Sequence, residues 1–336
     1  MKPFLLLTAA LAGSGVAGAR AQVGAMNQVD ASENRNQMNR TAKAALTESN
    51  SVPQLYEGET DDVGPQSVIQ PHERRKLFEA YADVQYFYTD NLLFKERRKL
   101  DTGVLASTIQ AALAPTAYPF ANGSLAPRLG YRHEWFDFGL DGKRIPFSPL
   151  KLSDLDFNAQ TIFSDALWTR GNWSFGAGFE WTRLMDTDQY RQFYLESVPN
   201  WTARWTFPVC EKSALGVSYN GDYRFTRIDP QFLEFSTKDA TDRTDHTLEL
   251  TFTEVLCKHA VFQPYYRMQF THFTAYPDGP RNDYLNSVGA GLYFMICPNF
   301  SVRTFVNYDI LSSENPRVDD YRKFDAGGGI DISLRF

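Results

Sequence analysis

The 336-residue chain has few cysteines, no long apolar run after its first residues, and no excess of positive charge. Its three cysteines form no Cys-x-x-Cys pair, and its five scattered histidines supply no zinc-ligand spacing, so we expect no metal or cofactor. No segment beyond residue 21 offers about 18 consecutive apolar residues, the length of a helical membrane span. A net charge of -6 argues against nucleic acid as a partner.

Aromatic residues, in contrast, are abundant. They make up 15% of the chain, as 26 Phe, 17 Tyr and 6 Trp. A transmembrane β-barrel carries a girdle of aromatic side chains at each membrane interface and needs that many.

The first residues predict export. Lys2 gives a positive start, residues 4–12 form a short apolar core, and Ala19-Arg20-Ala21 is a small-x-small cleavage site. The alternative, an N-terminal membrane anchor, would need a longer stretch to span about 30 Å of hydrocarbon. We therefore predict a signal peptide over residues 1–21 and a mature chain that starts near Gln22.

The next segment, residues 22–76, is polar and rich in Asn, Gln, Ser and Glu. It has too little apolar surface to offset the entropy of ordering, so we predict a disordered, periplasmic tail. The alternative is a tail that folds back into the barrel as a plug.

From residue 77 to residue 336, apolar alternation and turn signals recur regularly. Alternation with a period of two is typical of strands with two unlike faces. About twelve strands are predicted, although ten or fourteen remain possible because the second and fourth are weakly patterned. The predicted strands are 78–88, 103–114, 125–136, 155–168, 173–184, 191–207, 214–226, 244–256, 260–271, 284–296, 300–310 and 322–336.

The connections between these strands alternate between tight turns and long polar loops. Tight turns occur at 170–172, 210–212, 257–259 and 297–299, and longer loops lie between them. This is the pattern of an all-β, up-and-down antiparallel transmembrane barrel. An even strand number places both termini in the periplasm.

The last strand supports a bacterial outer-membrane location. Ile330, Ile332, Leu334 and Phe336 share one face, opposite Asp331, Ser333 and Arg335. It resembles the closing strand of outer-membrane barrels, whose terminal Phe is the signal for the barrel-insertion machinery. We therefore assign Phe336 as the barrel-assembly signal.

The polar faces of the strands must line a wet interior, because an Arg or Lys that faces lipid at the midplane costs about 2–4 kcal/mol. Arginines opposed by carboxylates across a lumen would set up a transverse field, as pores for charged solutes use. In the alternative, the groups pair in a filled, closed lumen. The candidate pore-lining residues are Asp83, Arg128, Arg132, Glu180, Arg204, Arg224, Glu249, Arg267 and Arg303.

Other chemistry is weakly indicated. Cys210, Cys257 and Cys297 occupy corresponding turn positions. A disulfide between two of them is the alternative, but neighbouring turns of a barrel are expected to lie more than about 7 Å apart, so we predict free cysteines. His133 and His246 lie next to Glu134 and Asp245, but adjacent strand residues point to opposite faces and form no acid–base pair. We predict no catalytic residues and no enzyme, and keep an outer-membrane hydrolase as the least favoured alternative.

Residues 82–94, Ala-Asp-Val-Gln-Tyr-Phe-Tyr-Thr-Asp-Asn-Leu-Leu-Phe, resemble the opening of the outer-membrane β-barrel porin family. That family often has an aromatic strand followed by an Asp-Asn-aliphatic step. The segment 57–66 is similar to one that precedes the barrel in some members. The resemblance covers roughly residues 77–336 and implies a pore without naming its solute.

Together these features predict a passive channel for small polar or charged solutes in the bacterial outer membrane. The expected partners are outer-membrane lipid and lipopolysaccharide, the insertion machinery, and the solutes. The alternative is a closed-lumen structural barrel that assists envelope assembly, such as a polysaccharide-export helper.

Overall fold

A computed structural model describes residues 17–50, 76–97, 99–140, 142, 151–187, 190–228, 239–277 and 279–336. Most of the predicted signal peptide and residues 51–75 of the predicted tail, with the segment 57–66, lie outside these residues. Among the described residues, no helix is both long and apolar enough to cross a membrane. The elements are α2 (Ala17–Asn50), β1 (Phe78–Thr89), β2 (Thr102–Leu113), β3 (Tyr118–Phe120), β4 (Gly123–Phe138), η1 (Leu152–Leu155), β5 (Phe157–Arg170), β6 (Trp173–Asp186), β7 (Gln192–Cys210), β8 (Ser213–Ile228), β9 (Arg243–Cys257), β10 (Ala260–Phe273), β11 (Arg281–Cys297), β12 (Phe300–Ser313) and β13 (Tyr321–Arg335).

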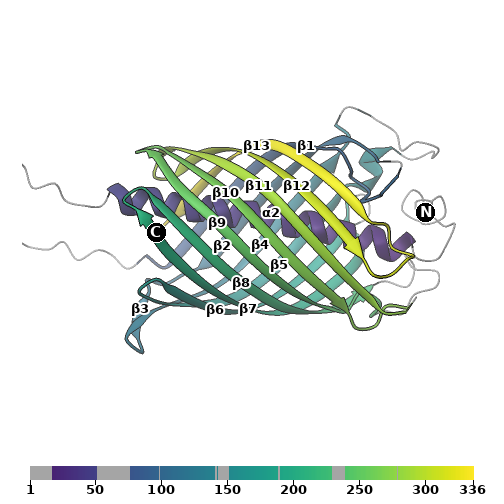
Figure 1. Cartoon of the computed structure of the whole chain (residues 1–336), viewed down its shortest axis with the longest axis horizontal. Coiled ribbons are helices and arrows are strands. Elements are labelled where there is room, and N and C mark those ends of the chain that lie inside the picture. The colour runs from purple at the N-terminus through teal and green to yellow at the C-terminus, as the bar shows by residue number, and fades with distance from the viewer. Residues whose placement is uncertain are drawn as a thin grey trace, which may run out of the picture.

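Twelve strands close into an antiparallel barrel around α2 (Figure 1). From β4 to β13 each strand pairs with the next along the chain, and β1 pairs with both β2 and β13. The pairing of β2 with β4 completes the ring. The predicted fold class and all twelve predicted strands are confirmed. The short β3 was not predicted; it pairs only with the start of β4 and forms a hairpin outside the ring.

Side chains alternate between the lipid-facing exterior and the interior, as the period of two predicts. On β12, Val306 is 46% exposed, whereas Arg303, three residues earlier and so on the opposite face, is 1% exposed. Exposed Phe262, Tyr266 and Met268 mark the outer face of β10. The predicted division into apolar outer and polar inner faces is therefore confirmed.

The two rims of the barrel differ. At one, here called the short-turn rim, two-residue turns join β5 to β6, β7 to β8, β9 to β10 and β11 to β12. The chain also ends there, where the backbone N–H groups of Leu77 and Phe78 donate to the Phe336 carbonyl over 2.9 and 2.8 Å. The other, the long-loop rim, carries the longer connections, including η1. The predicted alternation of turns and loops is confirmed.

The helix α2 runs through the lumen, which corrects the predicted disorder over residues 22–50 (Figure 1). An isolated polar helix has only marginal stability in water. The barrel wall stabilises α2 because it supplies partners for the helix side chains. Gly24 lies beside Phe94 at the long-loop rim, and Lys43 pairs with Asp331 near the short-turn rim. The first turns of α2 thus lie at the rim opposite Phe336, whereas both termini were predicted at one rim.

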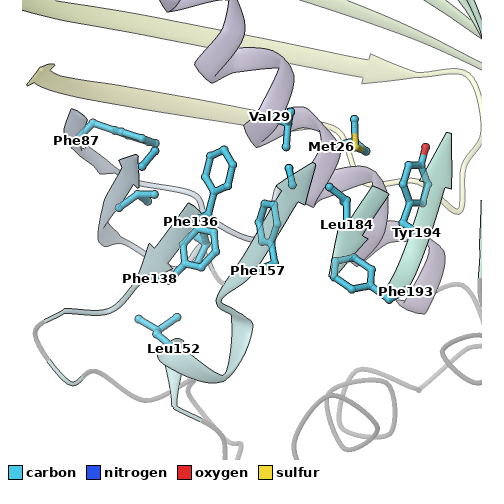
Figure 2. Packing of buried hydrophobic residues seen from close by; sticks show 14 of the residues in the cluster. Met26, Val29, Phe87, Phe136, Phe138, Leu152, Phe157, Leu184, Phe193 and Tyr194 are labelled. Atoms are coloured by element: carbon cyan, nitrogen blue, oxygen red, sulfur yellow. The ribbon is translucent and has the colours of Figure 1, made fainter. Parts of the chain in front are cut away.

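Two apolar clusters pack against α2. At the long-loop rim, Met26 and Val29 project toward buried aromatic and aliphatic side chains of the wall, among them Phe136 and Leu184 (Figure 2). Near the short-turn rim, Met38, Ala42 and Leu46 pack on Val255, Val261 and Tyr293. These clusters fix the two ends of the helix, and polar contacts fill the length between them.

Candidate functional site: the helix-filled lumen

The first polar cluster joins α2 to β4 and β6. Arg132 donates to Glu33 of the helix over 2.6 and 2.9 Å, and it also pairs with Glu134 at 3.1 Å and Glu180 at 3.4 Å. Arg132 and Glu134 are 5% and 1% exposed. One guanidinium thus serves three carboxylates, and two of the predicted pore-lining residues, Arg132 and Glu180, meet here.

A second cluster surrounds Arg224 on β8. Its guanidinium lies 3.1 Å from Asp30 of α2, 3.4 Å from Glu196, 3.3 Å from Asp222 and 3.0 Å from Asp245. Carboxylates from the wall and the helix therefore share this arginine. Hydrogen bonds of this charge-assisted kind are the stronger ones inside proteins.

A third contact lies on the opposite wall. Arg303 and Asp83 form a two-point ion pair, with oxygen–nitrogen distances of 2.8 and 2.9 Å, and both side chains are almost wholly buried. Arg303 also donates to Asn36 of α2 over 3.0 Å, and Tyr81 donates to the same amide oxygen over 3.1 Å. The pair is thereby tied to α2.

The remaining predicted pore-lining residues also face the interior. Arg267 donates to Glu249 over 2.6 and 2.9 Å. Arg128 pairs with Asp165 at 2.9 Å, and Arg204 donates to the Thr41 hydroxyl of α2 over 3.4 Å. Each predicted residue faces the lumen, but most pair with nearby strands or with the helix. The expected opposition of charges across an open lumen is therefore not observed.

Near the short-turn rim two side chains of the helix converge on one carboxylate. Asn39 and Lys43 both donate to Asp331, which also accepts from Ser301. Asp331 is 1% exposed. The terminal strand, which the sequence predicts to line the lumen, thus also holds α2.

A cavity of about 160 Å³ remains between α2 and the wall formed by β9 to β13. Its lining combines charged, amide and aromatic side chains. Among them are Asn34, Arg35, Tyr265, Tyr293, Asn307 and Lys323. The helix therefore leaves part of the lumen unfilled on the side of β9 to β13.

The cysteines and histidines behave as predicted from their positions. Cys210, Cys257 and Cys297 are free and exposed, which confirms the prediction. His133 stacks on Trp135 at 4.1 Å on the outer face, away from buried Glu134. Among the described residues no group of three His, Cys, Asp or Glu side chains could hold a metal ion.

Sequence reasoning missed the helix side chains that complete this site. These are Asp30, Glu33, Arg35, Asn36, Asn39 and Lys43, all on α2. One signal was available, because residues 25–50 contain neither Gly nor Pro and so carry no helix breaker. The partners on the wall could not be assigned without the barrel geometry.

Comparisons with known proteins bear on the fold alone. No protein-family model and no curated protein matches the chain. Among solved structures, an outer-membrane channel from Pseudomonas putida F1 is 10% identical with a TM-score of 0.50, over 81% of this chain and 100% of its own. The β domain of the Bordetella autotransporter Brka is 13% identical with a TM-score of 0.45, over 78% and 100%. The NanC porin is 10% identical with a TM-score of 0.41, over 75% and 100%. The chain has the fold of an outer-membrane β-barrel.

Proposed function

We propose that this protein is an outer-membrane channel for small polar or charged solutes that α2 closes as a plug. The observation that carries the proposal is that a polar helix occupies a polar lumen and is held there mainly by hydrogen bonds and ion pairs. Such contacts can be exchanged for water when the helix leaves.

The energetics favour a plug that can be displaced. Buried ion pairs add little net stability, since desolvation offsets their attraction, and removal of the helix would let water reach both partners. Met26, Val29 and Leu46 are each at most 2% exposed. Their burial contributes about 1.5–3 kcal/mol each, or about 4.5–9 kcal/mol together. Restored conformational entropy of the released helix would offset part of this.

In this proposal the short-turn rim faces the periplasm and the long-loop rim faces outward, toward lipopolysaccharide. The exposed apolar belt contacts lipid, and Phe336 is the signal that the insertion machinery reads. The lumen arginines, Arg267 and Arg303 among them, select the solute once the helix has moved. A solute carrier of this kind needs no catalytic group.

A second candidate is a closed-lumen structural barrel. It is favoured by the pairing of the lumen charges, since Arg132, Arg224 and Arg303 each contact a carboxylate and a residue of α2. In that case the helix would never leave. The two candidates differ in what happens when α2 is removed or tied down.

Planar-bilayer conductance of the refolded protein tests the proposal. Deletion of residues 25–46 should give frequent, large steps, whereas the full chain should open only briefly. A disulfide between α2 and the wall can hold the helix in place. Asn39→Cys and Ser301→Cys are combined for this purpose, because Ser301 Oγ donates to Asn39 Oδ1 over 3.3 Å. The three native cysteines are changed to serine in that variant. Oxidation should abolish the steps and reduction should restore them.

Each outcome decides between the candidates. If the barrel without α2 gives no steps, the channel proposal fails and the structural barrel stands. If oxidised and reduced proteins conduct equally, α2 is not the gate. Detectable ester hydrolysis by the purified barrel would instead support the hydrolase alternative.

A further inference from the structure

Arg35, midway along α2, is held in a fixed orientation inside the lumen. The side chain is 8% exposed. Its Nε donates to Gln85 Oε1 over 2.8 Å. The guanidinium carbon lies 4.5 Å from the centre of the Phe87 ring and 4.9 Å from that of Phe305. The hydrogen bond and the two rings set the direction of the remaining donors.

Within the described part of the chain, Arg35 has no carboxylate at ion-pair distance, and its Nη2 has no hydrogen-bond partner. Asp325, on the β13 part of the same wall, is held by Lys323 at 2.7 Å. The other cations that line the cavity are each paired with a carboxylate. These pairs are Lys95–Asp319, Arg243–Asp245, Arg267–Glu249, Arg281–Asp283, Arg303–Asp83 and Lys323–Asp325.

An unpaired buried charge is costly unless something compensates it. Arg35 lines the cavity of about 160 Å³ described above, together with Tyr265, Tyr293 and Asn307. That space exceeds the roughly 10–15 Å³ that one water needs by about tenfold. It can therefore hold a ligand the size of one small ring with a charged group.

We propose that this cavity binds a small organic anion that carries an apolar ring. The anion accepts hydrogen bonds from Arg35 Nη2, as the planar guanidinium suits carboxylate and phosphate oxygens. The ring packs against Tyr265 and Tyr293, which line the same space. Asn34 and Asn307 are further polar groups on the walls.

This site adds a ligand to the proposed channel. The binding of the anion is independent of the channel proposal, and only the effect of the anion on channel opening rests on it. Because α2 supplies Arg35 and Asn34, the complete site exists only while the helix is seated. A ligand that binds one state of an equilibrium stabilises that state. The anion therefore holds the plug in place and keeps the channel shut.

Calorimetric titration of the refolded full chain in detergent tests the site, with phenyl phosphate as the probe. Inorganic phosphate and phenol serve as the half-ligands. Phenyl phosphate should bind once per barrel and more tightly than either. Arg35→Gln should weaken it about ten- to hundredfold, as expected for the loss of a charged hydrogen bond.

The matched control is Arg40→Gln on the same helix, since Arg40 pairs with Glu79 at 3.8 Å and lies outside the cavity lining. It should leave the affinity unchanged. If Arg35→Gln does not fold, Arg35→Lys keeps the charge but loses the planar fork, and should bind more weakly than the native chain. Equal affinity of the native chain and the folded Arg35 variant overturns the site, as does phenyl phosphate binding no tighter than phenol.

Conductance separates the site from the gate. Phenyl phosphate should shorten the openings of the native channel and leave the barrel without residues 25–46 unaffected. Binding without any effect on openings would refute the gating consequence while the site stands. Absence of steps in the helix-free barrel would refute the channel and leave the calorimetric result untouched.

Discussion

The Arg303–Asp83 pair offers the sharpest test of how the lumen is stabilised. Both side chains are almost completely buried, and two nitrogen–oxygen contacts of 2.8 and 2.9 Å join them. Asp83→Asn leaves Arg303 without its counter-charge, and Arg303→Gln leaves Asp83 alone. Each single change should lower the free energy of unfolding by about 3–5 kcal/mol, the cost of one uncompensated buried charge.

The double variant should be much less destabilised than the sum of the single variants. Two neutral amides can hydrogen-bond to each other, and neither leaves a buried charge, so the coupling energy should exceed about 2 kcal/mol. Guanidinium unfolding of the refolded barrel in detergent, followed by tryptophan fluorescence, measures all four proteins. The half-exposed Arg128–Asp165 pair is the control, with side chains 29% and 34% exposed and an expected coupling of about 0–1 kcal/mol. Additive effects at Arg303 and Asp83 would refute the reasoning.

Three further predictions concern the helix, the lipid face and the closure of the barrel. Leu46→Ala should loosen the seat of α2 by about 2–5 kcal/mol, seen as more frequent bilayer openings, because it leaves a cavity in a fully buried cluster; unchanged openings would contradict a gating helix. Val306→Lys, in the middle of β12, should lower the free energy of unfolding by about 2–4 kcal/mol, because it places a charge at the bilayer midplane. Ile296→Lys, near the short-turn rim, should lower it by only about 0–1 kcal/mol. Equal costs would contradict the membrane placement. Gly327→Val should abolish refolding, because a Cβ atom at this position would overlap the backbone and a side chain of β1. Heat-dependent gel migration measures the folded fraction. Gly216→Ala is the control and should refold normally, because its Cβ atom would meet only the flexible Arg204 side chain, at 3.4 Å.

The strands were predictable because each carries its own signal. In β10, for example, Phe262, Tyr266 and Met268 alternate with Gln263 and Arg267, and no distant residue is needed to assign the faces. The short β3 was not predicted, because three residues, Tyr118 to Phe120, are too few to show an alternation of apolar and polar side chains. The lumen location of the arginines followed from the same alternation.

The helix was not predictable in the same way. Polarity on all sides of residues 22–50 suggested disorder, because such a helix has no apolar face to bury in an ordinary core. It is ordered here because the lumen wall is itself polar, and Glu33, Asn36 and Asn39 find partners on strands about 50 to 300 residues away. Those partners become neighbours only when the barrel closes.

The sequence by itself determined the barrel, the approximate position of each strand of the ring, its two faces and the inward direction of Arg132, Arg224 and Arg303, because strand alternation is a local property of the chain. Only the tertiary structure decided which charges pair, that α2 fills the lumen, and that Arg35 is left unpaired beside a cavity. Pairing depends on distances between strands far apart in sequence. The closed barrel decides whether the desolvation cost of each buried charge is offset by the attraction of a partner. The alternation of apolar and polar residues along each strand therefore defines the wall of the lumen, and the closed fold defines what occupies the lumen.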